Sequence, residues 1–256
     1  MLLKDQVCIV AGAASLRGIG YATAELFAEH GAKIVVVDVA MDERSSAHIA
    51  SLIRSNTRPD VEVLGLRCDI TSVADCDRMV ADTLSHFGSL DCLVNSAGIV
   101  RAQPLLEISE GDYDLMVDVN LKGAFNLCRS VLSTFVRQRR GVIVNVSSAA
   151  AQRGGGLVGG AHYAAAKGGV VSLTRSIARE YGPQGIRANV ICPAMIETAM
   201  LDGLSPERLE SIVSGIPLQR AGTTREAAGA CLFLASDLSG FVTGATIDVN
   251  GGSHIH

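Results

Sequence analysis

Short apolar runs rich in β-branched residues alternate along this chain with longer stretches whose apolar residues recur every three or four positions. The runs have the near-continuous hydrophobicity of strands buried on both faces, and the stretches between them have the period of amphipathic helices. We expect seven strands, at residues 6–11, 33–38, 61–67, 90–95, 141–147, 187–191 and 245–249. This alternation predicts an α/β fold: a Rossmann-type, doubly wound parallel sheet with helices on both faces.

Glycine marks the ends of several of the intervening helices. We expect helices at residues 21–30, 73–87 and 163–181, each followed directly by glycine, the usual residue just past a helix end. Residues 109–140 show no strand pattern and begin with Ser109, a good N-cap, so we expect one long helix there. No linker or repeat divides residues 1–256, which favours a single domain with a mobile substrate lid at about 195–216.

Composition limits the functions open to such a fold. The net charge is −4 and the charges are scattered, so the chain has no basic stripe for nucleic acid. Charged residues interrupt every run that approaches a membrane span, and the apolar start is too short for a secretory signal. The seven cysteines include no Cys-x-x-Cys, which is typical of buried thiols in a reducing cytosol. We expect a cytoplasmic protein that binds neither nucleic acid, nor membrane, nor metal.

The turn after the first predicted strand, residues 11–20, reads Ala-Gly-Ala-Ala-Ser-Leu-Arg-Gly-Ile-Gly and leads into a helix. Its glycines let the backbone approach a pyrophosphate, and the helix N-terminus faces the anion. Asp38 ends the second strand, where a carboxylate accepts both hydroxyls of an adenosine ribose and disfavours a 2′-phosphate. Arg17 would instead attract such a phosphate. We predict NAD, with NADP less favoured; a helix-capping role is the alternative for Asp38.

Tyr163 and Lys167 are one helical turn apart, and Ser148 precedes them in a Val-Ser-Ser sequence. A phenol is a poor acid or base at neutral pH, but an ammonium four residues on shares its helix face and lowers its pKa. The serine hydroxyl can hold a substrate oxygen beside the phenol. The three residues predict a proton-transfer site, and an ordinary surface pair is the alternative for Tyr163 and Lys167.

These motifs resemble those of the short-chain dehydrogenase/reductase family, in the branch similar to 3-oxoacyl-carrier-protein reductases. The likeness runs from about residue 5 to residue 252. Its motifs in chain order are the glycine turn, Asp69, Asn95-Ser-Ala-Gly98, Asn120, Ser148, Tyr163 with Lys167, and Cys192-Pro-Ala-Met-Ile-Glu-Thr198. Two spacings depart from the family pattern. Leu16 and Arg17 look inserted in the glycine turn, and extra length lies in the glycine-rich residues 154–160, which can loop out without moving Ser148 or Tyr163.

The resemblance implies a catalytic set of Asn120, Ser148, Tyr163 and Lys167. Tyr163 would be the acid/base, and Lys167 would lower its pKa and bind the nicotinamide ribose. Ser148, rather than Ser147, would orient the substrate oxygen. Asn120 would hold a water of a proton relay through Lys167.

The resemblance also implies how the cofactor is held. Asp69 and the backbone of Ile70 would contact adenine, and Ile196 and Thr198 would reach the carboxamide of the nicotinamide. The implied cofactor-binding residues are Gly12, Ser15, Arg17, Gly18, Ile19, Gly20, Asp38, Asp69, Ile70, Asn95, Ala97, Gly98, Tyr163, Lys167, Pro193, Ile196 and Thr198.

We predict an NAD(H)-dependent oxidoreductase that interconverts a small-molecule secondary alcohol and the corresponding ketone. An NADPH-dependent 3-oxoacyl-[acyl-carrier-protein] reductase is the alternative within this class. A nucleotide-binding regulator has little physical reason to hold the four catalytic residues, and a nucleotide-sugar epimerase usually needs a larger C-terminal domain. Candidate pocket residues are Arg101, Gln103, Gln152, Arg153, His162 and Met200. Apolar and small residues on the helices at 109–140 and 163–181 predict a homo-oligomer, either a tetramer or a dimer.

Overall fold

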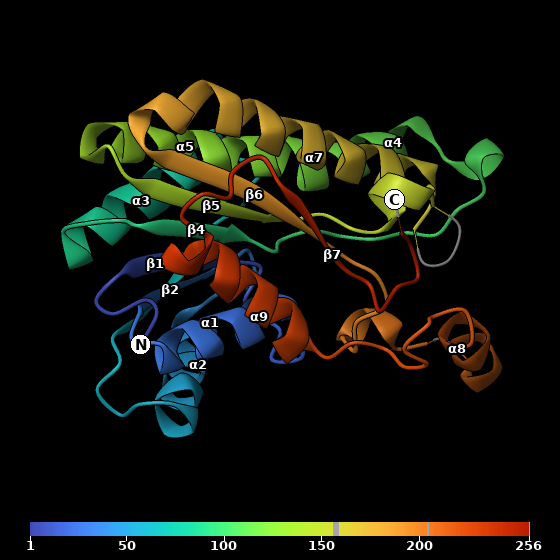
Figure 1. The fold of residues 1–256 in the computed structure, drawn as a ribbon, viewed down its shortest axis with the longest axis horizontal. Coiled ribbons are helices and arrows are strands. Elements are labelled where there is room, and N and C mark those ends of the chain that lie inside the picture. Colours follow the sequence, from blue (N-terminus) through green and yellow to red (C-terminus); the bar gives the residue numbers. More distant parts are fainter. Residues whose placement is uncertain (156–158, 204, 256) are drawn as a thin grey trace.

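The computed structural model describes residues 1–155, 159–203 and 205–255 (Figure 1). Its seven strands form one parallel sheet in the order β3-β2-β1-β4-β5-β6-β7. The strands are β1 (Val7–Ala11), β2 (Lys33–Asp38), β3 (Val63–Arg67), β4 (Cys92–Asn95), β5 (Gly141–Val146), β6 (Ile186–Pro193) and β7 (Thr246–Val249). All seven predicted strands are confirmed. The strand order reverses between β1 and β4, which is where doubly wound sheets open a crevice at their carboxyl edge.

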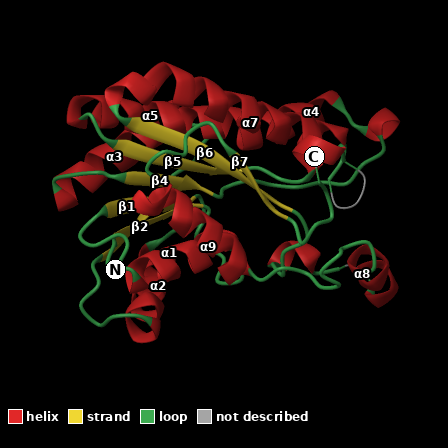
Figure 2. Cartoon of the chain, in the orientation of Figure 1, coloured by secondary structure: helices red, strands yellow, loops and turns green. Residues whose placement is uncertain are grey.

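Helices cover both faces of this sheet (Figure 2). One layer contains α3 (Val73–Phe87), α4 (Glu110–Val117), α5 (Gly123–Gln138) and α7 (Ala161–Tyr181). The other layer contains α1 (Ile19–Glu29), α2 (Glu43–Asn56) and α9 (Thr224–Ala235). Two short helices, α6 (Ala150–Arg153) and α8 (Pro206–Val213), follow β5 and β6 beyond the carboxyl edge. The predicted doubly wound architecture is confirmed.

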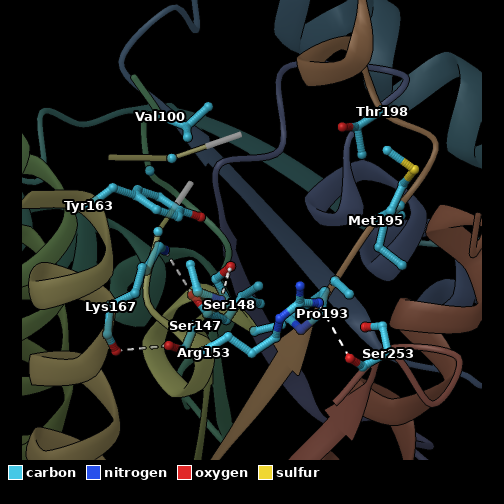
Figure 3. A pocket seen from close by; sticks show the side chains of 18 of the residues that line it. Val100, Ser147, Ser148, Arg153, Tyr163, Lys167, Pro193, Met195, Thr198 and Ser253 are labelled. Atoms are coloured by element: carbon cyan, nitrogen blue, oxygen red, sulfur yellow. Dashed lines mark hydrogen bonds between the residues drawn. The ribbon is translucent and has the colours of Figure 1, made fainter. Parts of the chain in front are cut away.

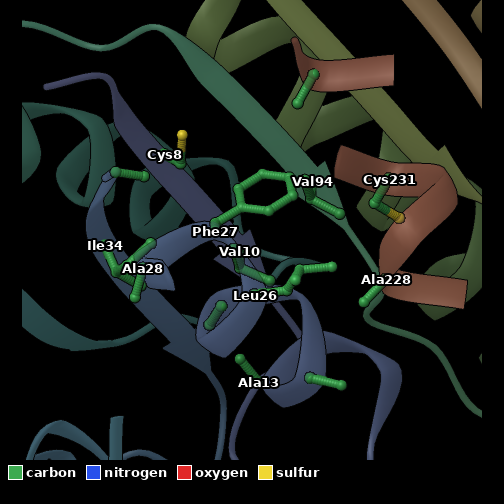
Figure 4. Packing of buried hydrophobic residues seen from close by; sticks show 14 of the residues in the cluster. Cys8, Val10, Ala13, Leu26, Phe27, Ala28, Ile34, Val94, Ala228 and Cys231 are labelled. Atoms are coloured by element: carbon green, nitrogen blue, oxygen red, sulfur yellow. The ribbon is translucent and has the colours of Figure 1, made fainter. Parts of the chain in front are cut away.

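Alternate residues of the strands belong to two different apolar cores. In β1, Cys8 and Val10 pack with Phe27 of α1, in the cluster that Figure 4 shows. Ile9, between them, packs on the other side of the sheet with Phe135 of α5. Both phenylalanines are fully buried. Burial on both faces explains why the strands are apolar at nearly every position, and it makes the sheet a rigid support for whatever its carboxyl edge carries.

The helix predicted over residues 109–140 forms, but it is not α-helical throughout. The Ser109 hydroxyl caps it by accepting a hydrogen bond from the Asp112 amide at 3.1 Å. Between α4 and α5 the residues Asp118–Lys122 form a π turn. The Asn120 side chain donates from Nδ2 to the Met116 carbonyl at 3.0 Å, the acceptor that an α-helix would give to the Asn120 backbone amide. The prediction of one long helix is therefore corrected at this turn.

All seven cysteines are buried and free, as predicted. No helix in the described part of the chain is long and apolar enough to cross a membrane. Within the same residues, no group of three or more His, Cys, Asp or Glu side chains is placed to hold a metal ion.

Candidate active site

A pocket of about 420 Å³ lies at the carboxyl edge of the sheet (Figure 3). Gly98 follows β4, Ser148 follows β5 and Pro193 ends β6, so three neighbouring strands deliver residues to one place. Carboxyl ends of parallel strands meet at one edge, which is where open α/β sheets bind their ligands. α7 supplies a further wall, and residues 195–216 supply another.

Tyr163 and Lys167 line the pocket from α7. The Lys167 Nζ lies 5.9 Å from the centre of the Tyr163 ring and donates a hydrogen bond to the Val146 carbonyl at 2.9 Å. Lys167 is only 5% exposed. The alternative of an ordinary surface pair is therefore wrong, because the ammonium is enclosed between the end of β5 and the phenol.

The two adjacent serines after β5 do different things. The Ser147 hydroxyl donates to the Lys167 carbonyl at 2.8 Å and so joins β5 to α7. The Ser148 hydroxyl accepts from the Ala150 amide at 3.1 Å and is near enough to the Tyr163 phenol to act on its pKa. This geometry supports Ser148 as the serine that meets a substrate oxygen.

Burial dominates the acid–base properties of the pair. It raises the pKa of Tyr163, against a hydrogen bond with Ser148 that lowers it. It lowers the pKa of Lys167 to about 8. The prediction that Lys167 brings the Tyr163 pKa below its usual range is wrong for this structure. The phenolate loses its hydration in the pocket, and the buried ammonium is itself driven towards its neutral form.

Asn120 is buried beside this pair and holds the chain that follows β4. Its Nδ2 donates to the Ile99 carbonyl at 3.0 Å, and its Oδ1 accepts from the Ile99 amide at 3.2 Å. A Cβ on Gly98 would lie 2.6 Å from Asn120 Oδ1 and 3.2 Å from Lys167 Nζ. Both polar atoms therefore border one small space that only glycine leaves open. The water relay assigned to Asn120 stays a prediction.

The glycine turn fits a pyrophosphate. Gly12 has a φ of +78°, and a Cβ there would lie 2.6 Å from the Ala97 amide nitrogen. A Cβ on Gly20 would lie 2.3 Å from the Gly12 carbonyl oxygen, so neither position tolerates a side chain. Gly18 is the N-cap of α1 and no side chain caps this end. The first amides of α1 are therefore open to an anion at the same edge of the sheet.

Asp38 stands next to this turn. Its Oδ2 accepts from the Ala14 amide and its Oδ1 from the Ala40 amide, both at 3.1 Å. The helix that follows is capped by Asp42, so the helix-capping alternative for Asp38 is wrong. Asp38 instead ties the end of β2 to the glycine turn, and its contact with a ribose stays a prediction.

Arg17 extends from the glycine turn to the segment after β6. Its Nη1 and Nη2 donate to the two carboxylate oxygens of Asp202 at 2.8 and 2.9 Å. The two residues are 185 positions apart, so no local pattern could have indicated this pair. The Arg17 guanidinium is therefore paired with the Asp202 carboxylate in this structure.

The residues predicted around adenine and along β4 make mostly internal contacts. The Asp69 carboxylate accepts from the Thr71 amide at 2.9 Å, and the Ile70 carbonyl accepts from Asn126 at 2.9 Å. Asn95 Nδ2 donates to Asn145 Oδ1 at 3.3 Å. These contacts support the sheet edge, and cofactor contacts by the same residues stay predictions.

The pocket brings together all four predicted catalytic residues and part of the predicted cofactor set. Of that cofactor set, the other lining residues are Ile19, Gly98, Pro193, Ile196 and Thr198. Of the candidate pocket residues, Arg153 lines it, whereas Arg101, Gln103, Gln152 and His162 do not. The Met200 side chain and residues 156–158 lie outside the described parts. Leu201, Ile212 and Ile216 line the pocket from the segment predicted as a lid, whereas sequence reasoning missed Val100 and Ser253, which line it from loops with no periodic pattern.

Known proteins match the chain along its whole length. The family model described as enoyl-(acyl carrier protein) reductase matches residues 12–254. An uncharacterized short-chain type dehydrogenase/reductase of Sinorhizobium fredii is 46% identical, with 100% of both chains covered. A 3-oxoacyl-[acyl-carrier-protein] reductase of Thermotoga maritima is 38% identical over 98% of this chain and 99% of that one. The solved structure of levodione reductase has a TM-score of 0.91 and 33% identity, covering 98% of each chain.

Proposed function

This chain belongs to the short-chain dehydrogenase/reductase family, and on that premise we propose that it is an NAD(H)-dependent oxidoreductase interconverting a secondary alcohol and its ketone. The observation that carries the proposal is the meeting of Ser148, Tyr163 and Lys167 on one side of a pocket beside a glycine turn without room for side chains. Such a site positions a hydroxyl or carbonyl oxygen and moves one proton.

A nicotinamide dinucleotide fits the residues at the sheet edge. The glycine turn and the open end of α1 would hold its pyrophosphate, Asp38 its adenosine ribose, and Lys167 its nicotinamide ribose. When bound, the cofactor supplies the hydride acceptor or donor. Two features support NAD over NADP. The Asp38 carboxylate repels a 2′-phosphate, and Arg17, the cation that would attract one, is paired with Asp202.

Ser148 and Tyr163 would share the substrate oxygen between their hydroxyls. The raised pKa of Tyr163 keeps the phenol protonated near neutral pH, which is the form that donates a proton to a carbonyl oxygen. Alcohol oxidation requires the phenolate, and Lys167, whose pKa is lowered to about 8, still carries positive charge at pH 7 to stabilise it. The protonated phenol and the charged ammonium at neutral pH therefore favour ketone reduction, and above pH 8 Lys167 loses the charge that would stabilise a phenolate.

Residues 195–216 would close over the substrate as a lid of the single domain. Met195, Leu201 and Ile212 from this segment line the pocket, and most of α8 is exposed. Apolar side chains at a pocket edge exclude water once a substrate is present.

A homo-oligomer, dimer or tetramer, is also part of the proposal. Tyr113, Phe125 and Val136 on α4 and α5 are 49%, 47% and 37% exposed. Exposed apolar residues on one long helical element support association through that face. The molar mass in solution, measured by light scattering, tests it.

An NADPH-dependent 3-oxoacyl-[acyl-carrier-protein] reductase is the second candidate. It is favoured by the 38% identity to the Thermotoga maritima protein of that name. Initial rates with NADH and NADPH, on simple ketones and on an acetoacetyl thioester, separate the two. A strong preference for NADPH and the thioester would select the second candidate.

Tyr163→Phe tests the proposed chemistry. We expect kcat/KM to fall by about 10³-fold on every substrate that turns over, while NADH still binds in a fluorescence titration. Tyr181→Phe, at the far end of the same helix, is the matched control and keeps the wild-type rate. An unchanged rate in Tyr163→Phe would overturn the proposal.

A further inference from the structure

The charged side chains described around the pocket are all cations. Among the described lining residues only Lys167 and Arg153 carry a charge, and none carries a carboxylate. Lys167 is buried, bonded to the Val146 carbonyl and held under the Tyr163 ring. Arg153 is the exposed residue that ends α6, five positions after Ser148. The cation that faces the open part of the pocket is therefore Arg153.

Most of the hydrogen-bonding capacity of Arg153 is unused by the protein. Its Nη1 donates to the Ser253 carbonyl at 3.4 Å, a long contact, and within the described ranges it forms no ion pair. A guanidinium has five N–H donors in a planar fork that matches the two oxygens of a carboxylate. Its remaining donors are available at the pocket wall.

Ser253 adds a second, independent sign of a ligand at this wall. It lines the pocket, yet its hydroxyl oxygen is buried and has no hydrogen-bond partner in the described structure. A buried hydroxyl without a partner is unfavourable, so such an atom usually marks the place of a ligand or a water. Figure 3 shows Arg153 and Ser253 joined at the pocket, on the other side of Ser148 from Tyr163 and Lys167.

We propose that Arg153 and Ser253 bind a carboxylate of the substrate while Ser148 and Tyr163 hold its reacting oxygen. The inference rests on the proposed function and narrows its substrate to a hydroxy acid and the corresponding oxo acid. Ser148 and Arg153 line the same pocket, so one substrate molecule can contact both. The apolar walls from Val100, Ile212 and Ile216 suit a short hydrocarbon between the two ends.

Arg153 would thus determine specificity without taking part in proton transfer. The Arg153–carboxylate pair would form in a pocket whose described lining holds no acidic side chain, so no carboxylate there would repel the substrate or compete for Arg153. An uncharged ester or thioester of the same length would leave the guanidinium and the Ser253 hydroxyl unpaired, which discriminates against it.

The test compares acids with their methyl esters, using 3-hydroxybutanoate and 4-hydroxypentanoate as probes for two spacings. We expect the wild type to have a kcat/KM at least tenfold higher for one of the acids than for its ester. Arg153→Met should lower kcat/KM for that acid by about 10–100-fold, mainly through KM, and change the ester by less than threefold. Arg153→Lys should keep only part of the preference for the acid. Ser253→Ala should lower kcat/KM for the acid about threefold to tenfold.

A second measurement, inhibition by a simple carboxylate, does not require the true substrate to be known. Propanoate should inhibit oxidation of a neutral secondary alcohol competitively and more strongly than propanamide, and Arg153→Met should abolish that difference. Arg179→Met, an exposed arginine of α7 outside the pocket, is the matched control and should leave both ratios unchanged.

The outcomes separate this inference from the proposed function. Neutral alcohols that turn over only when Tyr163 is present, with no preference for any acid, would overturn the carboxylate site and leave the proposed function standing. Equal losses for acid and ester in Arg153→Met would also overturn it, since that pattern marks a structural role. A wild-type rate in Tyr163→Phe would instead overturn the proposed function on which this inference rests.

Discussion

Two walls of the pocket are attached to the molecule in very different ways. The α7 wall is joined to β5 by the Ser147 hydroxyl and by the Lys167 ammonium, both buried. The wall from residues 195–216 is anchored near its ends by the buried Ile196 and Ile216, but its outer part is held by the Arg17–Asp202 pair, whose side chains are 62% and 59% exposed. Exposed ion pairs contribute about 0–1 kcal/mol, whereas buried hydrogen bonds to charged groups contribute about 1.5–3 kcal/mol.

This difference separates two requirements of a proton-transfer site. The groups that move a proton must keep their geometry to within a fraction of an ångström, so they stand on the sheet. The proposed lid must open and close, and its exposed attachment permits that. Substitutions on the lid side can then change the substrate while leaving the proton-transfer groups in place.

Lys167→Met attacks the firmly held wall and carries the largest expected effect. We expect kcat to fall by about 10³-fold. The folded-state pKa of Lys167 is lowered from 10.5 to about 8, so its burial costs stability below pH 8, and this cost disappears as the pH rises towards 10.5. The variant should therefore be more stable than the wild type by up to about 3 kcal/mol at pH 7, less whatever the unpaired Val146 carbonyl costs, and the gain should vanish near pH 10.

Urea unfolding of both proteins at pH 7 and at pH 9.5 measures this gain. A variant that is less stable than the wild type at pH 7, or a gain that does not change with pH, would contradict the assignment of a depressed pKa to Lys167.

Gly98→Ala sharpens the comparison by crowding the same wall without removing any functional group. The new Cβ would lie 2.6 Å from Asn120 Oδ1, so the amide must shift from its bonds to Ile99. We expect a loss of kcat of about 10–100-fold. Gly229→Ala on α9 is the control, because a Cβ there meets nothing within 4 Å; it should keep full activity and gain about 0.5–1 kcal/mol. Equal activity in the two variants would show that the space beside Gly98 has no role.

Asp38→Asn tests the cofactor end of the sheet edge, beside the glycine turn. Removing the negative charge should lower the ratio of kcat/KM for NAD to that for NADP by about tenfold, since a charge repulsion of roughly 1.4 kcal/mol is lost. Asp42→Asn, at the N-cap of α2, is the control and should leave the ratio unchanged. A ratio that is the same in Asp38→Asn and the wild type would remove Asp38 from cofactor selection.

Arg17→Gln and Asp202→Asn probe the weakly held wall and should have the smallest effect. We expect stability changes below about 1 kcal/mol and KM changes within about threefold, because the pair is exposed. A double-mutant cycle isolates the coupling energy. A coupling well above 1 kcal/mol would break the contrast between the two walls.

Features carried by local pattern were predictable from the sequence. Continuous apolar runs gave every strand, and Ser109 marked a helix start correctly. The features that depend on tertiary closure were not predictable. The π turn arises because Asn120 bonds across to Ile99, and the pKa direction of Tyr163 follows from how deeply the fold buries it. The Arg17–Asp202 pair joins residues 185 positions apart. The catalytic residues of the site could be predicted from their motifs. Which charged side chains line the pocket could not.

The π turn at Asp118–Lys122 has a consequence for how this stretch of chain can vary. One surplus residue in a helix rotates everything beyond it by about 100° around the axis. Asn120 is directed to Ile99 on one side of the turn, and Phe135 is directed into the sheet on the other. Deleting a single position between them would swing one of the two out of register. The length of this stretch is therefore constrained even at positions whose side chains make no essential contact.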